Sequence, residues 1–173
     1  MPGYHFMRNN NLFVIILIII SIVGSLFLFN SEWLVIQEAE SDKVIWQQPV
    51  EGNIEFAIKY LHSVERTPVW EYFVVKDNKL YLTGTRYESY GAGLPFLKQH
   101  TYVVGDGKFE IKNIDKKLDS IPLRVSDYAL HKFIIDKEEY KLYKMTEPQN
   151  LVIIKVKNQN LLALLKNKLV NWL

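Results

Sequence analysis

An uncharged, apolar stretch near the N-terminus limits what this chain can form. It runs from Leu12 to Phe29 and contains 18 residues, of which only Ser21, Gly24 and Ser25 are not strongly apolar. A helix of this length spans about 27 Å, close to the thickness of the hydrocarbon core of a bilayer. The stretch is longer than the apolar part of a signal peptide, and no small-residue cleavage site follows it. We therefore predict an uncleaved transmembrane signal anchor.

The charges that flank this stretch predict its orientation. Arg8 precedes it, whereas Glu32, Glu38 and Glu40 follow it. Positive charge is retained on the cytoplasmic side of a membrane. We expect residues 1–29 to form a cytoplasmic N-terminus and the single-pass anchor, with the rest of the chain on the outer side of a cytoplasmic membrane.

The composition indicates one folded domain after the anchor and excludes several function classes. The chain of 173 residues is 49% hydrophobic and 23% charged, which is typical of a folded protein. Its 21 basic and 19 acidic residues provide no basic field for nucleic acid. The lack of cysteine excludes disulfides, thiolate metal sites, a cysteine nucleophile and a lipidated cysteine. Membrane lipid is therefore expected to contact the chain through the peptide anchor, and no nucleic-acid partner is expected.

Beyond the anchor, apolar residues recur with a period of two, which indicates β-strands. The clearest alternation places Ile54, Phe56 and Ile58 on one face of a strand. Turn-forming residues predict hairpins over residues 70–87 and 101–111. We expect residues 30–159 to form a mainly β domain, a sandwich or a partly open barrel of about eight or nine short strands.

The last segment, residues 160–173, is predicted to be an amphipathic helix. Its leucines and Trp172 fall on one face, and lysines occupy much of the rest. Two interpretations remain open. The helix lies against the membrane or a partner, or it covers the end of the β domain.

Two stretches of the predicted β domain carry information beyond their strand pattern. Residues 60–71 are Tyr-Leu-His-Ser-Val-Glu-Arg-Thr-Pro-Val-Trp-Glu, and residues 85–95 are Thr-Arg-Tyr-Glu-Ser-Tyr-Gly-Ala-Gly-Leu-Pro. The residues of these stretches with polar or turn-forming side chains are the candidates for a ligand site or a structural network: His62, Ser63, Glu65, Pro68, Glu71, Arg86, Gly91, Gly93 and Pro95.

The two stretches resemble the motifs of the bacterial domain-of-unknown-function 1850 family. In that family His-Ser-Val is followed by Thr-Pro-Val and Glu, and then by an Arg and Gly-Ala-Gly-Leu-Pro. The resemblance extends over most of the segment after the anchor. It implies an accessory role beside tripartite (TRAP) transporters of the TAXI type, which import organic acids with a periplasmic binding protein. The permease or its solute receptor is then the expected partner.

An enzymatic hypothesis stays open beside this one. A serine next to a histidine suggests a hydrolase with Ser63 as nucleophile. Adjacent residues of a strand point to opposite faces, however, so His62 is poorly placed to activate Ser63. No Gly-x-Ser-x-Gly turn is present either.

A metal site is the second enzymatic alternative. Imidazole and carboxylate groups bind zinc or manganese, and His62, Glu65 and Glu71 with His100 or His131 would supply them. No closely spaced ligand motif such as His-Glu-x-x-His supports this alternative. A structural network is the simpler hypothesis.

That network would join the two motif stretches. We expect His62 and Glu71 to hold the loop at Thr67 and Pro68 by hydrogen bonds, and Arg86 to pair with one of the carboxylates.

The glycine-rich sequence at residues 91–95 predicts a turn. Glycines let backbone N–H groups approach an anion, but the Lys-Ser/Thr of a nucleotide loop is missing, so we expect no cofactor. A further hypothesis places this loop with Arg86 and His62 around a small anion such as a carboxylate.

Overall fold

The computed structural model describes residues 5–28, 30–88, 102–105 and 108–160. The chain divides into two compact units, Met1–Ser31 with Asn158–Leu173, and Glu32–Lys157. Each unit is considered by itself. Apart from Asn160, which ends a strand, the helix predicted for residues 160–173 lies outside the described residues.

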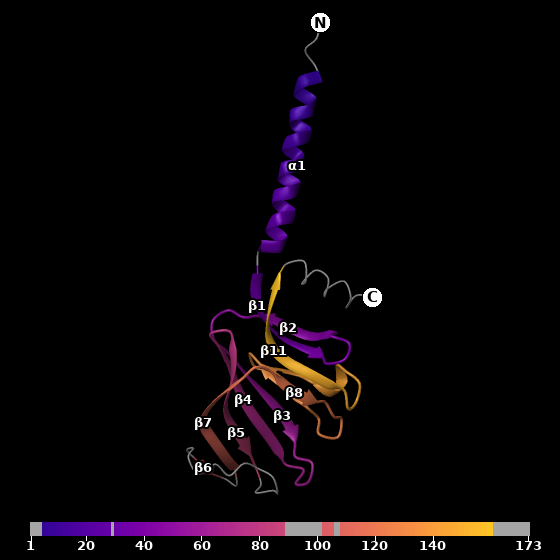
Figure 1. The fold of residues 1–173 in the computed structure, drawn as a ribbon. Helices are drawn as coiled ribbons and strands as arrows, with labels where there is room; N and C mark the ends of the chain where they lie inside the picture. Colours follow the sequence, from indigo (N-terminus) through magenta and orange to yellow (C-terminus); the bar gives the residue numbers. More distant parts are fainter. Residues whose placement is uncertain (1–4, 29, 89–101, 106–107, 161–173) are drawn as a thin grey trace. The chain divides into compact units, whose positions relative to one another are not determined.

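The first unit contains one described helix, α1 (His5–Leu28), which Figure 1 shows as a continuous rod. Its apolar run contains no proline and no charge, so no residue interrupts the backbone hydrogen bonds. Every side chain from Leu12 to Ile20 is large and apolar and is 45–63% exposed. Within the part of the chain that is described, no helix combines the length and the apolar character needed to cross a membrane.

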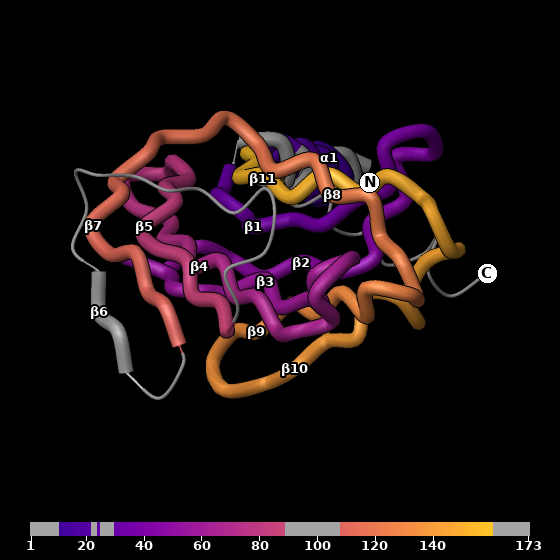
Figure 2. Tube along the Cα trace, turned by 90° about the horizontal axis from the view of Figure 1, so that it is seen from below, coloured from indigo at the N-terminus to yellow at the C-terminus, as the bar shows by residue number. Residues whose placement is uncertain are grey.

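The second unit is built from two antiparallel sheets that form two layers (Figures 1 and 2). The strands run in the order β2-β1-β11-β8 in the smaller sheet and β10-β9-β3-β4-β5-β7-β6 in the larger sheet. The prediction of a mainly β domain is therefore confirmed, and of the two predicted alternatives, a sandwich or a partly open barrel, the two layers correspond to the sandwich. The strands are β1 (Asn30–Glu38), β2 (Val44–Pro49), β3 (Ile54–Leu61), β4 (Pro68–Lys76), β5 (Lys79–Tyr87), β6 (Tyr102–Gly105), β7 (Lys108–Leu118), β8 (Ile121–Arg124), β9 (Lys132–Ile135), β10 (Glu138–Tyr140) and β11 (Leu151–Asn160).

The main core lies between the two sheets, because strands of both layers direct alternate apolar side chains inward. Leu34 of β1 and Ile154 of β11 meet Ile58 of β3 and Phe133 of β9 in one buried cluster. Phe133 is fully buried, and its ring lies 4.7 Å from the ring of Trp46 between centroids. We call the side of the larger sheet that faces this core the inner face, and the opposite side the outer face.

The strand register decides which motif residues share a face. On the inner face, Ile58 pairs with Glu71, and Glu71 pairs with Thr85. On the outer face, the next row pairs Lys59 with Trp70 and Trp70 with Arg86. The two motif stretches therefore contribute to both sides of the same sheet.

The pairing of β5 with its neighbours is irregular at one point. Thr83 is an additional residue of β5 between Leu82, which pairs with Phe73, and Gly84, which pairs with Tyr72. Such an extra residue is a β-bulge, and it turns the following side chains to the other face.

The described part of the chain contains more strand than predicted. The short strand β10 was not predicted, and β7 continues to Leu118 although the prediction ended at Ile111. Asn113 and Asp115 adopt positive φ angles of 57° and 48° within β7, a conformation that Asn and Asp tolerate better than most residues. These irregular positions let a polar segment continue as a strand where no apolar alternation marks one.

Candidate functional site

The first motif stretch forms a loop that His62 closes. The Nδ1 atom of His62 accepts hydrogen bonds from the backbone N–H groups of Val64 at 3.4 Å and Glu65 at 3.2 Å. Its own backbone N–H donates to the carbonyl oxygen of Thr67 at 2.9 Å, and its carbonyl oxygen accepts from Arg66 at 3.1 Å. His62 thus supplies three of its polar groups to the loop between β3 and β4.

This loop is attached to a second loop that precedes β9. The guanidinium group of Arg66 donates to the carbonyl oxygen of Tyr128 at 2.9 Å, and its Cζ lies 4.1 Å from the centroid of the Tyr128 ring. The backbone N–H of Leu61 donates to the carbonyl oxygen of Ala129 at 2.8 Å. The structure therefore brings residues 62–67 together with residues 126–131, a pairing that the sequence did not indicate.

His131 stabilises that second loop. Its Nδ1 atom accepts a hydrogen bond from the backbone N–H of Ser126 at 3.1 Å, and its ring lies 5.5 Å from the ring of Tyr60 between centroids. Burial lowers the pKa of His131. The sequence had suggested His131 only as an alternative metal ligand.

Three other candidates take simpler positions. Ser63 and Glu65 are exposed in the His62 loop, and Pro68 is the first residue of β4, opposite Leu61. A proline is tolerated at the start of a strand because its missing N–H costs no interior ladder bond there. Ser63 therefore lies at the surface beside a histidine whose Nδ1 is already engaged.

Glu71 lies on the inner face of the larger sheet and is largely withdrawn from water. Burial raises the pKa of its carboxyl group. Tyr60 shares this face, and burial together with the nearby charge of Glu71 raises the pKa of its phenol to about 12. The hydroxyl of Thr85, opposite Glu71, donates to the carbonyl oxygen of Trp70 at 3.1 Å. The carboxyl group of Glu71 and the phenol of Tyr60 therefore hold their protons more tightly than they would in water.

Arg86 was expected to pair with one of the carboxylates, and the structure places it on the opposite face of the larger sheet from Glu71, so Glu71 is not its partner. Arg86 lies on the outer face, where its Cζ is 4.9 Å from the centroid of the Trp70 ring. Lys59 reaches the same ring, with its Nζ at 5.0 Å from the centroid. The bulge at Thr83 is the physical reason, because it shifts the register of β5 by one residue before Arg86.

The remaining candidates cannot be placed. Gly91, Gly93 and Pro95 lie outside the described residues, as does His100. Over the described part of the chain, no three His, Cys, Asp or Glu side chains gather in a way that would hold a metal ion. Lys59 was not named as a candidate from the sequence, although its place in the alternating pattern of β3 could have assigned it to the outer face.

Replacing His62 with alanine should lower the free energy of unfolding by about 1 kcal/mol, because two backbone N–H groups lose their acceptor. This corresponds to a decrease of a few degrees in the thermal midpoint. The matched variant His62→Asn keeps a side-chain acceptor and should recover much of the loss. Circular dichroism melts of the original protein and the two variants provide the measurement. Equal midpoints would show that the His62 side chain does not stabilise the loop.

The raised pKa of Glu71 predicts a stability that depends on pH. Its folded-state pKa lies above the unfolded value, so its contribution is complete at low pH and is lost as the pH rises through the folded pKa. Glu71→Gln removes this titration. We expect the variant and the original protein to melt together near about pH 4, and the variant to melt higher at about pH 8. A difference that is constant across this range would contradict the assignment.

Comparisons with known proteins bear on the same segment. A family model described as a domain of unknown function (DUF1850) matches residues 56–142. No curated protein and no solved structure matches the chain. The matched residues make up half of the chain and contain both motif stretches, from β3 to the segment after β10. The chain therefore belongs to the DUF1850 family.

Proposed function

We propose that this protein is a membrane-anchored accessory protein whose β domain acts outside the cytoplasmic membrane, as a companion of a tripartite organic-acid transporter. The observation that carries the proposal is α1. Nine consecutive large apolar residues, Leu12 to Ile20, are all about half exposed, so the apolar surface surrounds the helix. A helix that is apolar on every side is normally covered by protein or lipid.

The energetic argument favours an apolar environment for this helix. Full burial of one large aliphatic side chain contributes about 1.5–3 kcal/mol. Nine half-exposed side chains therefore retain a favourable burial term on the order of 10 kcal/mol. A lipid bilayer supplies such burial along a whole helix. The sequence from Leu12 to Phe29, of which the structure describes only part of the side chains, has the length that such burial requires.

The accessory role rests on the resemblance of the two motif stretches and on how their residues are used. In the His62 loop, histidine and arginine side chains bind the protein's own backbone. Side chains that hold their own backbone in this way make the loop rigid. A rigid surface suits a protein that contacts a permease or a solute receptor. The resemblance of the two motif stretches implies that the transported substrates are organic acids.

The anchor is tested by substitution within the full chain. Two aspartates, Ile16→Asp with Ile19→Asp, each place about 2.5–3.5 kcal/mol of unfavourable free energy at the centre of a spanning helix. We expect the original protein to remain in membranes after alkaline carbonate washing and the variant to be released. The control Val64→Asp changes an exposed apolar residue of the β domain and should remain bound. Release of the original protein would contradict the anchor, and intact-mass analysis would show whether the N-terminus is retained.

The orientation has its own test, because the chain has no cysteine. A membrane-impermeant maleimide should label Ser41→Cys in intact cells and should label Asn9→Cys only after the membrane is opened. The opposite pattern would place the β domain in the cytoplasm.

The partner is tested by uptake. Cells that lack this chain should import radiolabelled organic acid more slowly through the tripartite transporter, and the full chain should restore the rate. Site-specific photo-cross-linking from the His62 loop should join the chain to the permease or the receptor. Normal uptake without the chain would reject the accessory role and leave the anchor unaffected.

A further inference from the structure

The outer face of the larger sheet carries its charges in an ordered pattern. Along β3, the outward residues are Glu55, Ala57 and Lys59, so that an acidic, a small and a basic residue follow one another. Strand β9 runs antiparallel beside it and presents Lys132 next to Lys59 and Ile134 next to Ala57. The face therefore has three rows across the strands, a basic row, an apolar row and an acidic row.

Strands β4 and β5 extend all three rows, and the acidic row continues from Glu55 with the uncharged residues Val74 and Tyr81. In the basic row, Trp70 and Arg86 continue from Lys59, and in the apolar row, Tyr72 and Gly84 continue from Ala57. Successive outward residues of a strand are about 6.6 Å apart, so the basic and acidic rows are separated by about 13 Å.

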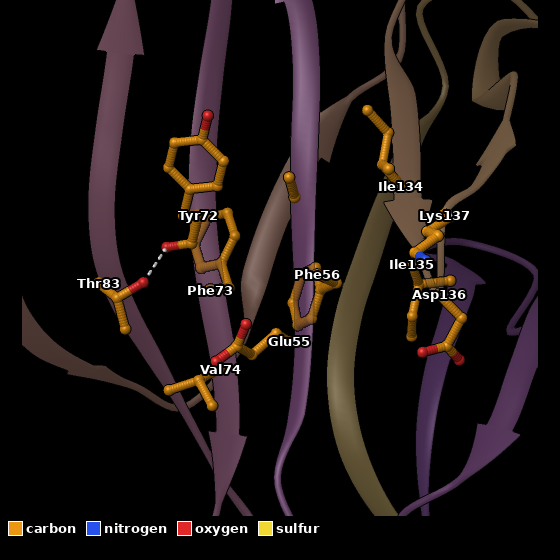
Figure 3. A pocket seen from close by; sticks show the side chains of 11 residues that line it. Glu55, Phe56, Tyr72, Phe73, Val74, Thr83, Ile134, Ile135, Asp136 and Lys137 are labelled. Atoms are coloured by element: carbon orange, nitrogen blue, oxygen red, sulfur yellow. Dashed lines mark hydrogen bonds between the residues drawn. The ribbon is translucent and has the colours of Figure 1, made fainter. Parts of the chain in front are cut away.

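The apolar and acidic rows border an open groove of about 560 Å³ (Figure 3). Its apolar lining includes Ala57, Tyr72 and Ile134. The carboxylates of Glu55 and Asp136 lie at one end, where Lys137 also lines the groove. A neighbouring hollow of about 490 Å³ shares these two carboxylates and adds Glu51. Among the residues that line this hollow there is no Lys or Arg.

The basic row keeps unbalanced positive charge. Two carboxylates lie close to this row. Lys132 of the same row engages Glu139 at 2.8 Å, and Lys59 also attracts that carboxylate. Glu110 lies opposite Arg86 in the register and is engaged by Lys112 at 3.5 Å. Lys59 and Arg86 instead lie over the Trp70 ring. In the part of the chain that is described, neither makes an ion pair within 4.0 Å. The two ends of the face thus carry opposite charges that remain available.

We propose that a second copy of this chain packs on this outer face. A twofold axis that runs along the apolar row would place the basic row of one copy over the acidic row of the other. Lys59 of each copy would face Glu55 of the other, and the two Ile134 side chains would meet near the axis. A twofold interface must be self-complementary, and a face with a basic end, an apolar middle and an acidic end meets this requirement.

A free anion fits this face less well than a second copy does. A carboxylate would be attracted by Lys59 and Arg86, but the rest of the ligand would lie beside Glu55 and Asp136, which repel negative charge. The groove is also open along its length, which suits a flat partner. The patch measures only about 14 Å by 13 Å between backbone positions, so it is small for a stable dimer and we expect weak association.

Charge exchange within the full chain tests the dimer. Each variant also carries Ile134→Cys, and disulfide-linked dimer is measured at several concentrations in an excess of empty detergent micelles. Glu55→Lys and Lys59→Glu should each reduce the rate of cross-linking about fivefold to tenfold, because the symmetry repeats each substitution at two contacts. The double variant with both substitutions restores opposite charges across the interface and should recover the original rate. Unchanged thermal midpoints in the four proteins would show that the effect is not unfolding.

A second cysteine position separates specific from accidental contact. Glu147→Cys is exposed outside the larger sheet and should cross-link slowly, at a rate that the two charge substitutions do not change. Equal rates for the two cysteines, or a double variant that cross-links no faster than the single variants, would overturn the proposal. If the face binds an anion at Trp70 instead, the double variant should cross-link no faster than the single variants. Glu55→Lys cannot restore the binding of a free anion that Lys59→Glu removes.

Discussion

Replacing Phe133 with alanine should lower the free energy of unfolding by about 3–5 kcal/mol, the largest effect expected of any single substitution discussed. Phe133 is fully buried, and its ring centroid lies 4.7 Å from that of Trp46 and 5.1 Å from that of Phe56. Alanine would remove these contacts and leave a cavity between the two sheets, because residues of both layers hold the surrounding cluster in place.

Urea denaturation of the full chain in detergent, followed by tryptophan fluorescence, measures this loss. Trp46 contacts Phe133 directly, so its emission reports on the same cluster. The graded variant Phe133→Leu keeps most of the volume and should cost about 1–1.5 kcal/mol. If both variants unfold at the same urea concentration as the original protein, the core does not depend on this ring.

Replacing Gly84 with alanine should cost about 1–3 kcal/mol, the second largest effect expected. A Cβ atom at this position would lie 2.8 Å from the carbonyl oxygen of Ile111, which belongs to the neighbouring strand β7. A backbone oxygen in the middle of a sheet has little freedom to move, so the two strands would have to separate. Gly84 is thus explained by the close approach of two backbones at the bulge.

The same denaturation experiment tests Gly84, with a neighbour as control. Thr83→Ala removes one methyl group and the hydroxyl that donates to the carbonyl oxygen of Tyr72 at 3.1 Å, which should cost about 0.5–1.5 kcal/mol. Gly84→Val adds further atoms and should be worse than Gly84→Ala. A series in which the glycine variants are no less stable than Thr83→Ala would show that β5 and β7 adjust without strain.

Strand identity was accessible from the sequence where one face is buried. The alternation from Ile54 to Tyr60 predicted β3 correctly, because each strand that covers the core must direct every second side chain inward. Strand β10 was missed because Glu138–Tyr140 contains only three residues, two of them acidic. It exists through pairing with β9, a tertiary contact that leaves no periodic pattern.

The two motif stretches were likewise recognisable from the sequence, and family membership follows from them. Their mutual arrangement was not recognisable. His62 was expected to act with Glu71 and Arg86, but its hydrogen bonds remain within its own loop, which a second loop near Tyr128 supports. Contacts between segments more than 60 residues apart depend on how the sheets close.

The sequence by itself determined that the segment after the apolar stretch forms strands, and that Trp70 and Glu71 of β4 point to opposite faces. Only the tertiary structure decided the face of Arg86. If β4 and β5 paired regularly from their turn, Arg86 would lie opposite Val69, on the same face as Glu71. The extra residue Thr83 moves Arg86 opposite Trp70, because a shift of one residue exchanges the two faces of a strand. That bulge depends on the fit between β5 and its neighbours, which no residue of β5 encodes alone.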